Sequence, residues 1–227
     1  ADKIVAISQQ TKNDIQKYFK IPASKIEVIY QDCDSQFHLS FQDTERKLIS
    51  QKYNLPESFV LSVGTIEKRK NQLNILKALN GTNIPLVLVG RATKYQEELK
   101  VYIQDNGMND QVIFINNVNF NELPVIYNLA TVFAYPSIFE GFGIPIIEAQ
   151  NQQTPVITSK GSCFNETGAD AALYASPDNP NELSDLILEV FRDATLREDL
   201  TLKGLINVQR FRAENTYPQL QKIYESL

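Results

Sequence analysis

Short apolar runs alternate with helical patterns through most of this 227-residue chain, and this alternation limits the folds it can adopt. Seven runs are apolar on both faces and predict strands: Ile4–Ile7, Ile26–Tyr30, Phe59–Val63, Leu86–Val89, Val112–Ile115, Val132–Tyr135 and Pro155–Thr158. Helical patterns occupy 9–19, 43–53, 71–79, 95–106, 121–129, 145–152 and most of 181–226. The alternation predicts an α/β fold, a doubly wound parallel sheet with right-handed crossovers and C-terminal helices.

The stretch 31–42 is irregular and marks a seam in the chain. Residues 1–30 predict a small piece, one strand and one helix, joined to a doubly wound body. Three polar positions suit helix starts, namely Ser8, Asn121 and Asn179.

Composition excludes several classes of function. The net charge of −5 and the lack of a basic run argue against nucleic acid and against an anionic membrane surface. No apolar stretch has the length of a transmembrane helix, and the opening Ala1–Val5 lacks a signal-peptide layout. Cys33 and Cys163 make no disulfide framework, so we expect buried thiols and a cytoplasmic setting.

Residues 137–149 join two carboxylates to a glycine-containing loop and a predicted helix start. Glycines let a backbone approach a ligand closely, and Pro145 suits a first helical turn because no N–H is needed there. The N-terminus of a helix favours an anion. We expect Glu140 on the loop and Glu148 in the first turn. Carboxylates near a phosphate repel it unless they bind hydroxyls, so the run predicts a site for a sugar joined to a phosphate. An ordinary strand-to-helix turn is the alternative.

A basic turn, Gly64-Thr-Ile-Glu-Lys-Arg-Lys-Asn71, follows the predicted strand 59–63. Ligands of an open parallel sheet bind beyond the carboxyl ends of the strands, so this turn should meet the loop 137–149. Arg69 and Lys70 oppose the dipole of the next helix unless an anion is present, and arginine chelates phosphate oxygens bidentately. A solvated turn with Glu67 as the partner is the alternative.

Three segments, in this order and spacing, resemble the donor-binding half of family 4 retaining glycosyltransferases. They are Gly64–Asn71, Pro136-Ser-x-x-Glu-Gly-Phe-Gly-x-Pro-x-x-Glu148-Ala and Thr154-Pro-Val-Ile-Thr. The spacing Glu-x7-Glu is the signature of that family, and the similarity runs from Ala1 to about Ala172. The resemblance implies a GT-B fold, in which two Rossmann-like domains face a cleft. The C-terminal domain binds the nucleotide-sugar donor and the N-terminal domain binds the acceptor.

On this resemblance, residues 31–227 are the donor-binding domain and residues 1–30 are a remnant of the preceding N-terminal domain with the hinge. Two such domains need nearly twice this length, so the acceptor domain is expected to be missing. Asn215–Leu227 is the candidate for the final helix that crosses back onto that domain. The full-length enzyme is expected to be cytoplasmic, at most peripheral at the inner membrane face.

The resemblance also implies roles for individual residues. Arg69 and Lys70 would neutralise the donor diphosphate, Glu140 would bind hydroxyls of the transferred sugar, and Glu148 would hold the ribose hydroxyls. The other donor-binding positions fall in the basic turn, in the glycine loop and in a weaker base-binding loop that also fits a plain turn: Gly64 and Thr65; Gly141, Phe142, Gly143 and Ile144; Val118 and Asn119.

The sequence departs from the family pattern at four places. Gln31-Asp32 stands where the family usually has Asn-Gly, and Thr65 stands where many members have arginine. Gln153 occupies a frequent glycine position, and Asn165 replaces a proline.

The expected reaction is transfer of a sugar, with retention at the anomeric carbon, from a nucleotide diphosphate sugar to a saccharide or lipid-linked acceptor. The form of the basic turn resembles members that use GDP-mannose. Without the acceptor domain, the chain should bind donor without efficient transfer. An epimerase or phosphorylase of the same fold and a non-catalytic binding module are the alternatives.

No metal or other cofactor is expected. Asp32-Cys33-Asp34 imitates the Asp-x-Asp metal motif of a different glycosyltransferase fold, but lies at the predicted hinge, far in sequence from both phosphate loops. His38, the single histidine, is expected to be a surface residue.

Overall fold

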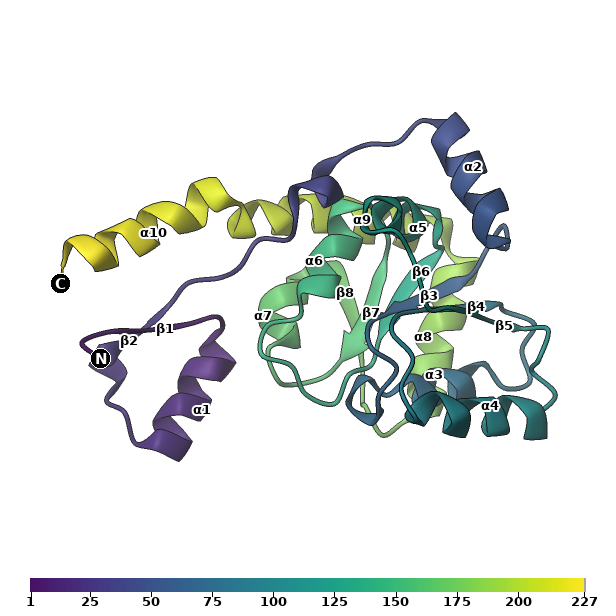
Figure 1. Ribbon diagram of the computed structural model, residues 1–227, viewed down its shortest axis with the longest axis horizontal. Coiled ribbons are helices and arrows are strands. Elements are labelled where there is room, and N and C mark those ends of the chain that lie inside the picture. The colour runs from purple at the N-terminus through teal and green to yellow at the C-terminus, as the bar shows by residue number, and fades with distance from the viewer. Residues whose placement is uncertain (227) are drawn as a thin grey trace.

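A six-stranded parallel sheet forms the centre of the protein in a computed structural model, which describes residues 1–226 (Figure 1). Its strands lie in the order β5-β4-β3-β6-β7-β8, and every neighbouring pair is parallel. Their bounds are β3 (Val60–Val63), β4 (Leu86–Val89), β5 (Val112–Ile115), β6 (Val132–Tyr135), β7 (Val156–Ser159) and β8 (Ala172–Ala175). The predicted doubly wound α/β fold is confirmed.

Helices cover both faces of this sheet (Figure 1). One face carries α3 (Gln72–Leu79), α4 (Tyr95–Asp105) and α8 (Pro180–Arg192). The other carries α2 (Asp43–Tyr53), α5 (Leu123–Leu129) and α6 (Ile144–Asn151). Successive side chains of a strand point to opposite faces, so Val60 joins the first layer and Leu61 the second, each with no exposed surface. Burial of each such side chain contributes about 1.5–3 kcal/mol.

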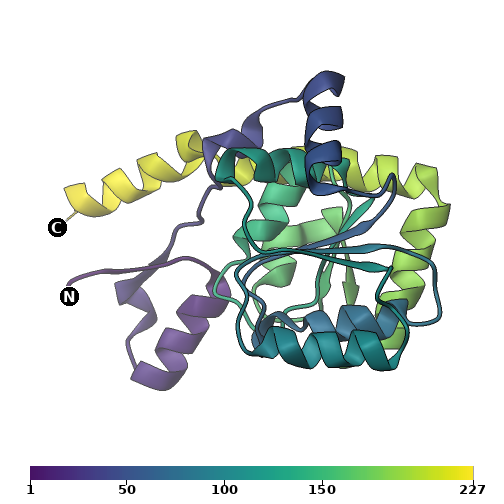
Figure 2. The ribbon, with the colours of Figure 1, turned by 45° about the vertical axis from the view of Figure 1, so that its right-hand side comes forward.

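The N-terminal piece has a small sheet of its own. It comprises β1 (Ile4–Ala6), α1 (Gln9–Phe19), a 3₁₀ turn (Ala23–Lys25) and β2 (Ile26–Val28). β1 and β2 pair with each other in parallel and join no strand of the main sheet. Figures 1 and 2 both show this piece beside the body. Both strands match predicted runs, Ile4–Ile7 and Ile26–Tyr30, so the piece contains two strands and one helix and not one of each.

Three helices close the chain: α8, α9 (Ala194–Asn207) and α10 (Ala213–Glu225), with a 3₁₀ turn (Val208–Phe211) before the last. α10 leaves the body and runs towards the N-terminal piece, where residues of α10 and β2 line a common groove (Figure 2). A helix is present where one was predicted over Asn215–Leu227, and Leu227 lies outside the described residues. The crossing of this helix onto another domain stays a prediction. Among residues 1–226, no helix has the length and hydrophobicity that a membrane span requires.

Two elements were not expected from the sequence. β8 is Ala172-Leu-Tyr-Ala175, which lacks the β-branched residues that mark the other strands, and forms because it pairs with β7. α7 (Phe164–Gly168) is a single short turn followed by a 3₁₀ turn (Ala169–Ala171). The helix expected over 121–129 begins at Leu123, after a 3₁₀ turn (Phe120–Glu122).

The backbone conformation just after α6 explains why the family often has glycine where this chain has Gln153. Gln153, which stands at a frequent glycine position, has a φ of 61°. That left-handed conformation costs a residue with a Cβ about 1–2 kcal/mol, and glycine is free of the penalty. Asp32 is not among the residues with positive φ, so its backbone does not need the glycine that the family often has at the hinge.

We expect Gln153→Gly to raise the free energy of unfolding by about 1 kcal/mol, less than the whole strain because glycine also gains freedom in the unfolded chain. Urea denaturation would measure the change. Gln153→Ala is the matched control and should give no gain, since alanine keeps the Cβ. Equal stabilities of the glycine and alanine variants would contradict the strain argument.

Candidate functional site

The two predicted motifs meet at the point where the strand order reverses. β3 is followed in sequence by β4 and β5 on one side, and the chain then returns to place β6 on the other side of β3. Open α/β sheets bind ligands in the crevice beyond the carboxyl ends at such a switch point. The backbone carbonyl of Arg69, after β3, accepts hydrogen bonds from the Ile138 N–H (2.9 Å) and the Ser137 hydroxyl (3.0 Å), after β6.

Glu140 is the centre of this contact. Its Oε1 atom lies 2.6 Å from Arg69 and 2.7 Å from the Lys70 ammonium. The same oxygen accepts hydrogen bonds from the hydroxyls of Tyr135 (2.9 Å) and Ser137 (2.7 Å). None of these four contacts engages the second oxygen, Oε2. The predicted convergence of Arg69, Lys70 and Glu140 is therefore present.

Burial and charge act in opposite directions on Glu140. The side chains of Glu140 and Lys70 are only 12% exposed, and burial alone would raise the pKa of the carboxyl. Hydrogen bonds from Lys70, Arg69 and Ser137 outweigh burial and lower the pKa, so Glu140 is ionised at neutral pH. Arg69 also pairs with Glu67 at 2.8 Å and is 42% exposed. Glu67, the partner named in the solvated-turn alternative, thus pairs with Arg69 alongside Glu140.

Glu148 lies deeper than expected. α6 begins at Ile144, after Gly143 in a left-handed conformation with a φ of 97°, so Glu148 falls in the second helical turn and not the first. Its carboxylate accepts a hydrogen bond from the hydroxyl of buried Tyr127 (2.8 Å). Burial, together with the negative charge of Asp34, raises the pKa of Glu148 to about 7.

Three successive carbonyls of the glycine loop are held by side-chain donors. The Glu140 carbonyl accepts from the Ser162 hydroxyl (3.2 Å) and the Cys163 thiol (3.3 Å). The Gly141 carbonyl accepts from Ser8 (2.6 Å) and Thr11 (3.1 Å) of the N-terminal piece. The Phe142 carbonyl accepts from Thr167.

These bonds fix the direction of the loop N–H groups. In a trans peptide the N–H of one residue points opposite to the carbonyl of the residue before it. The N–H groups of Gly141 and Gly143 are therefore directed away from the segment Ser162–Thr167. At the first residue of α6, Ile144, the N–H has no intrahelical partner. A loop of oriented N–H groups before a helix N-terminus can bind an anion or sugar oxygens.

The N-terminal piece touches this loop directly. A Cβ added to Gly141 would lie 3.1 Å from the Ile7 side chain, so little space remains between them. Glu166 accepts hydrogen bonds from the first two N–H groups of α1, at Gln9 (2.7 Å) and Gln10 (2.9 Å). The carboxylate thus stabilises the positive end of that helix.

The remaining predicted positions lie at the same end of the sheet. Gly64 follows β3, and the Thr65 carbonyl accepts a hydrogen bond from Gln72 (3.1 Å). Val118 is partly buried against the core, while the side chain of Asn119 caps the turn that follows β5 by accepting the Asn121 N–H (3.2 Å). The plain-turn alternative therefore describes the local structure of Asn119.

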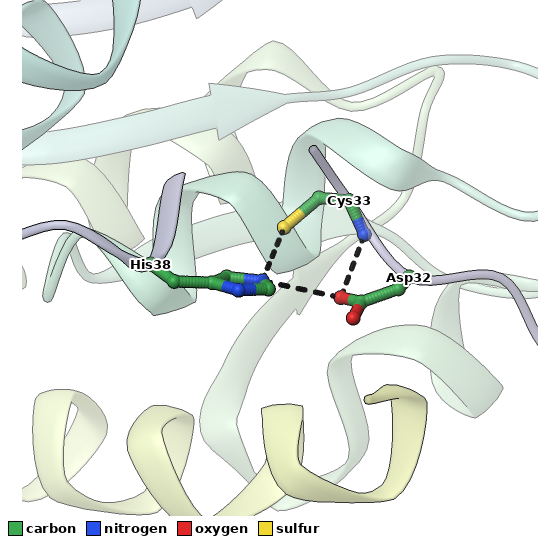
Figure 3. A group of neighbouring side chains, drawn as sticks. All are labelled: Asp32, Cys33 and His38. Carbon is green, nitrogen blue, oxygen red and sulfur yellow. Dashed lines mark hydrogen bonds and ion pairs between the residues drawn. The ribbon is translucent and has the colours of Figure 1, made fainter. Parts of the chain in front are cut away.

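The Asp-x-Asp pattern at the hinge is not assembled. Asp34 accepts the N–H of Gln36 (3.0 Å) and caps the 3₁₀ turn Ser35–His38. Asp32 lies instead beside Cys33 and His38 (Figure 3). The side chain of His38 is 24% exposed and contacts both, which the expectation of a plain surface residue did not include.

Sequence reasoning missed the hydroxyls that support the site. Tyr135 is the last residue of β6, and Ser137 precedes Glu140 by three positions, so their nearness to the motif is visible in the sequence. Thr167 and Tyr127 contact it only through the tertiary fold. No local pattern could have identified those two.

The family described as glycosyl transferases group 1 matches residues 43–204. The chain belongs to the group 1 glycosyl transferases. It is 30% identical over its whole length to O-antigen chain mannosyltransferase B of Escherichia coli, covering 61% of that protein. It is 31% identical to the O-antigen chain mannosyltransferase RfbU of Salmonella typhimurium, with 86% of this chain and 53% of that protein aligned. The chain thus spans little more than half the length of these relatives.

Solved structures show the same fold. A crystal structure of Anabaena HepE in complex with UDP and glucose superposes with a TM-score of 0.91 at 22% identity, covering all of this group 1 glycosyl transferase chain and 64% of HepE. The C-terminal domain of a group 1 glycosyl transferase, LpcC of Francisella tularensis, superposes with a TM-score of 0.68 at 24% identity, covering 78% of this chain and 96% of that domain. The expected Rossmann-like α/β fold of one half of a GT-B enzyme is confirmed.

The two carboxylates should have opposite effects on stability. The folded-state pKa of Glu148 lies above its ordinary value of 4.5, so ionising it costs stability as the pH rises towards and through about 7. We expect Glu148→Gln to raise the free energy of unfolding by about 2–3 kcal/mol at pH 8 and by little at pH 5.

Glu140→Gln is the matched control. The pKa of Glu140 is lowered, so its ionised form contributes stability above pH 4.5 that is lost as the pH falls below that value. This variant should therefore destabilise the protein at pH 8. Urea denaturation at both pH values measures each effect. A gain from Glu148→Gln that is the same at pH 5 and pH 8 would refute the assignment.

Proposed function

We propose that this chain is the donor-binding half of a retaining glycosyltransferase that transfers a sugar from a nucleotide diphosphate sugar. The observation that carries the proposal is the meeting of Arg69, Lys70 and Glu140 beside a helix N-terminus at the switch point. Cations, oriented N–H groups and carboxylates, in that arrangement, suit a diphosphate flanked by hydroxyl-bearing rings.

In this proposal the diphosphate shares Arg69 and Lys70 with Glu140. Arg69 is the more exposed of the two cations and can turn towards a ligand, whereas Lys70 is held by Tyr135 (2.6 Å) as well as by Glu140. Glu140 binds a hydroxyl of the transferred sugar, for which Oε2 is suited because the four contacts described converge on Oε1. Glu148 binds the ribose hydroxyls from its deeper position.

The chemistry needs charge stabilisation more than a proton donor. As the bond between the anomeric carbon and the diphosphate breaks, negative charge gathers on phosphate oxygens, where Arg69, Lys70 and the loop N–H groups would stabilise it. Preorganised donors cost no reorganisation at that moment. No metal ion is needed for this neutralisation. Binding of the acceptor and exclusion of water are assigned to an N-terminal acceptor domain, which these 227 residues do not include.

The donor is proposed to be GDP-mannose, with the transferred mannose joined to a saccharide or lipid-linked acceptor. The support is that several relatives are named mannosyltransferases, including O-antigen chain mannosyltransferase B and RfbU, and that the basic turn resembles members that use this donor. The solved structure of the C-terminal domain of LpcC, of which the chain covers 96%, supports the assignment to the C-terminal half.

Calorimetry should show that this chain binds GDP more tightly than UDP, in the presence or absence of EDTA. Arg69→Ala combined with Lys70→Ala should weaken GDP binding at least tenfold, because two cations that face the diphosphate are removed (about 1.4 kcal/mol or more).

Lys68→Ala is the control for that double variant, since Lys68 belongs to the same turn but pairs with Glu98 at 3.3 Å. It should bind GDP as the unaltered chain does. Failure of the folded chain to bind any nucleoside diphosphate would refute the donor site. Tighter binding of UDP than GDP would refute only the choice of donor.

The hydrogen bond from Thr167 to the Phe142 carbonyl of the glycine loop gives a second test. Thr167→Val removes the hydroxyl that holds the Phe142 carbonyl but keeps the side-chain shape. Released from that bond, the peptide between Phe142 and Gly143 can rotate, so GDP affinity should fall several-fold while guanosine affinity is kept. Thr201→Val is the control. It removes a hydroxyl that donates to the Gln153 carbonyl, beyond the far end of α6 from the loop, and should change neither affinity. Unchanged GDP affinity in Thr167→Val would show that this hydrogen bond does not orient the loop for donor binding.

A further inference from the structure

Three side chains with metal-ligating atoms gather at the hinge, away from the loops assigned to the donor. The Cys33 sulfur lies 3.6 Å from Nε2 of His38, and that nitrogen lies 3.3 Å from Oδ1 of Asp32 (Figure 3). All three ligating atoms lie within 4.8 Å of one another. Asp32 and Cys33 belong to the hinge segment after β2, and His38 belongs to the 3₁₀ turn that follows.

Two of the three separations match a tetrahedral zinc site, and the third, between the Cys33 sulfur and the Asp32 carboxylate, is within 4.8 Å. Zinc bonds of about 2.3 Å to sulfur and about 2.0–2.1 Å to nitrogen and oxygen place a sulfur and a nitrogen ligand about 3.6 Å apart, and a nitrogen and an oxygen ligand about 3.3 Å apart. The observed separations of 3.6 Å and 3.3 Å agree with both values. A soft sulfur with an imidazole and a carboxylate favours zinc over magnesium or calcium, which prefer oxygen alone.

The groups around the three ligands suit a bound cation in two further ways. The Asn151 amide donates to the Cys33 sulfur (3.3 Å), and the Ala213 N–H donates to Oδ2 of Asp32 (3.2 Å). Oδ1 accepts the Cys33 N–H (2.8 Å) and also faces His38. Outer hydrogen bonds of this kind orient metal ligands. A cavity of about 670 Å³ is lined by all three ligands and gives an ion a route from solvent.

We propose that Asp32, Cys33 and His38 bind one Zn²⁺ ion, with water in the fourth position. The three ligands lie outside the donor loops, but Cys33 is near enough to Glu148 for their charges to interact. The zinc site ties the hinge to the 3₁₀ turn and, through the Asp32–Ala213 contact, to the start of α10. The cation would fix the angle at which the crossing helix and the N-terminal piece leave the body.

Binding is a ligand exchange without redox chemistry. The Cys33 thiol loses its proton to the buffer, and the sulfur–zinc bond forms as a zinc-bound water leaves. His38 binds as the neutral imidazole through Nε2. Arg212, which lines the same cavity, donates a hydrogen bond to the Asn151 amide oxygen (3.0 Å).

The probe is Co²⁺, a spectroscopic substitute for Zn²⁺, added to the metal-stripped chain under reducing conditions. We expect a thiolate-to-cobalt charge-transfer band that saturates at about one ion per chain, with the strong visible absorption of a tetrahedral site. Zinc should displace the cobalt, abolish the band and raise the melting temperature of the chain. Calorimetry in two buffers should detect the released proton.

Cys33→Ser and His38→Gln should each lose the charge-transfer band or weaken metal affinity at least tenfold, while both variants fold. Cys163→Ser is the matched control, because Cys163 is the other buried thiol and lies at the glycine loop. It should keep the band unchanged. No band in the unaltered chain, or a band that persists in Cys33→Ser, would overturn the proposal. Neither result bears on GDP binding.

Discussion

Four donors converge on Oε1 of Glu140, and the arrangement of the candidate site depends on that convergence. Two of the donors are cations from the turn after β3, and the other two are hydroxyls from the segment that carries Glu140 itself. Since β3 and β6 are neighbours at the reversal of strand order, these contacts join the two halves of the sheet at its carboxyl end. Glu140 holds Arg69 and Lys70 in place, and Glu67, which also pairs with Arg69, balances the remaining positive charge.

The candidate site combines a rigidly held glycine loop with a buried carboxyl group, Glu148, that lowers the stability of the fold. Side chains from two segments, Ser8–Thr11 and Ser162–Thr167, hold the loop carbonyls, which fixes the N–H groups before any ligand arrives. Glu148 is different, because its burial opposes ionisation and lowers stability at neutral pH. A strained or destabilised group persists at a binding site when function requires it. This cost is consistent with the proposal that Glu148 binds the ligand, because its buried charge opposes folding.

Much of this fold could be predicted because each strand of the main sheet is covered on both faces. Such strands carry apolar runs, as in Leu86–Val89, and only Ala172–Ala175 lacked enough β-branched residues to be recognised. Arg69 and Glu140 were identified from short motifs whose spacing reflects the local turn. Thr167 and Tyr127 were not, because their contacts arise from tertiary packing. Glu148 was placed one turn too early, since helix boundaries are set by capping geometry at Gly143.

At the hinge, too, sequence spacing did not predict which side chains lie together. Asp32 and Asp34 form a pattern in the sequence, but the backbone turns between them and sends Asp34 to cap the next 3₁₀ turn. Asp32 is brought to His38, six positions along, by that same turn. Spacing alone could not distinguish these two outcomes, because the choice depends on the conformation of Cys33 between them.

The most direct measurement of the central claim is the amide NMR spectrum of the isotope-labelled chain as GDP-mannose is added. The account predicts that the largest shifts fall on the amides of Gly141, Gly143 and Ile144 and on the turn that holds Arg69 and Lys70, because these N–H groups and cations surround the diphosphate. Shifts confined to the opposite end of the sheet, for example around Gln153 and Thr201, would contradict it.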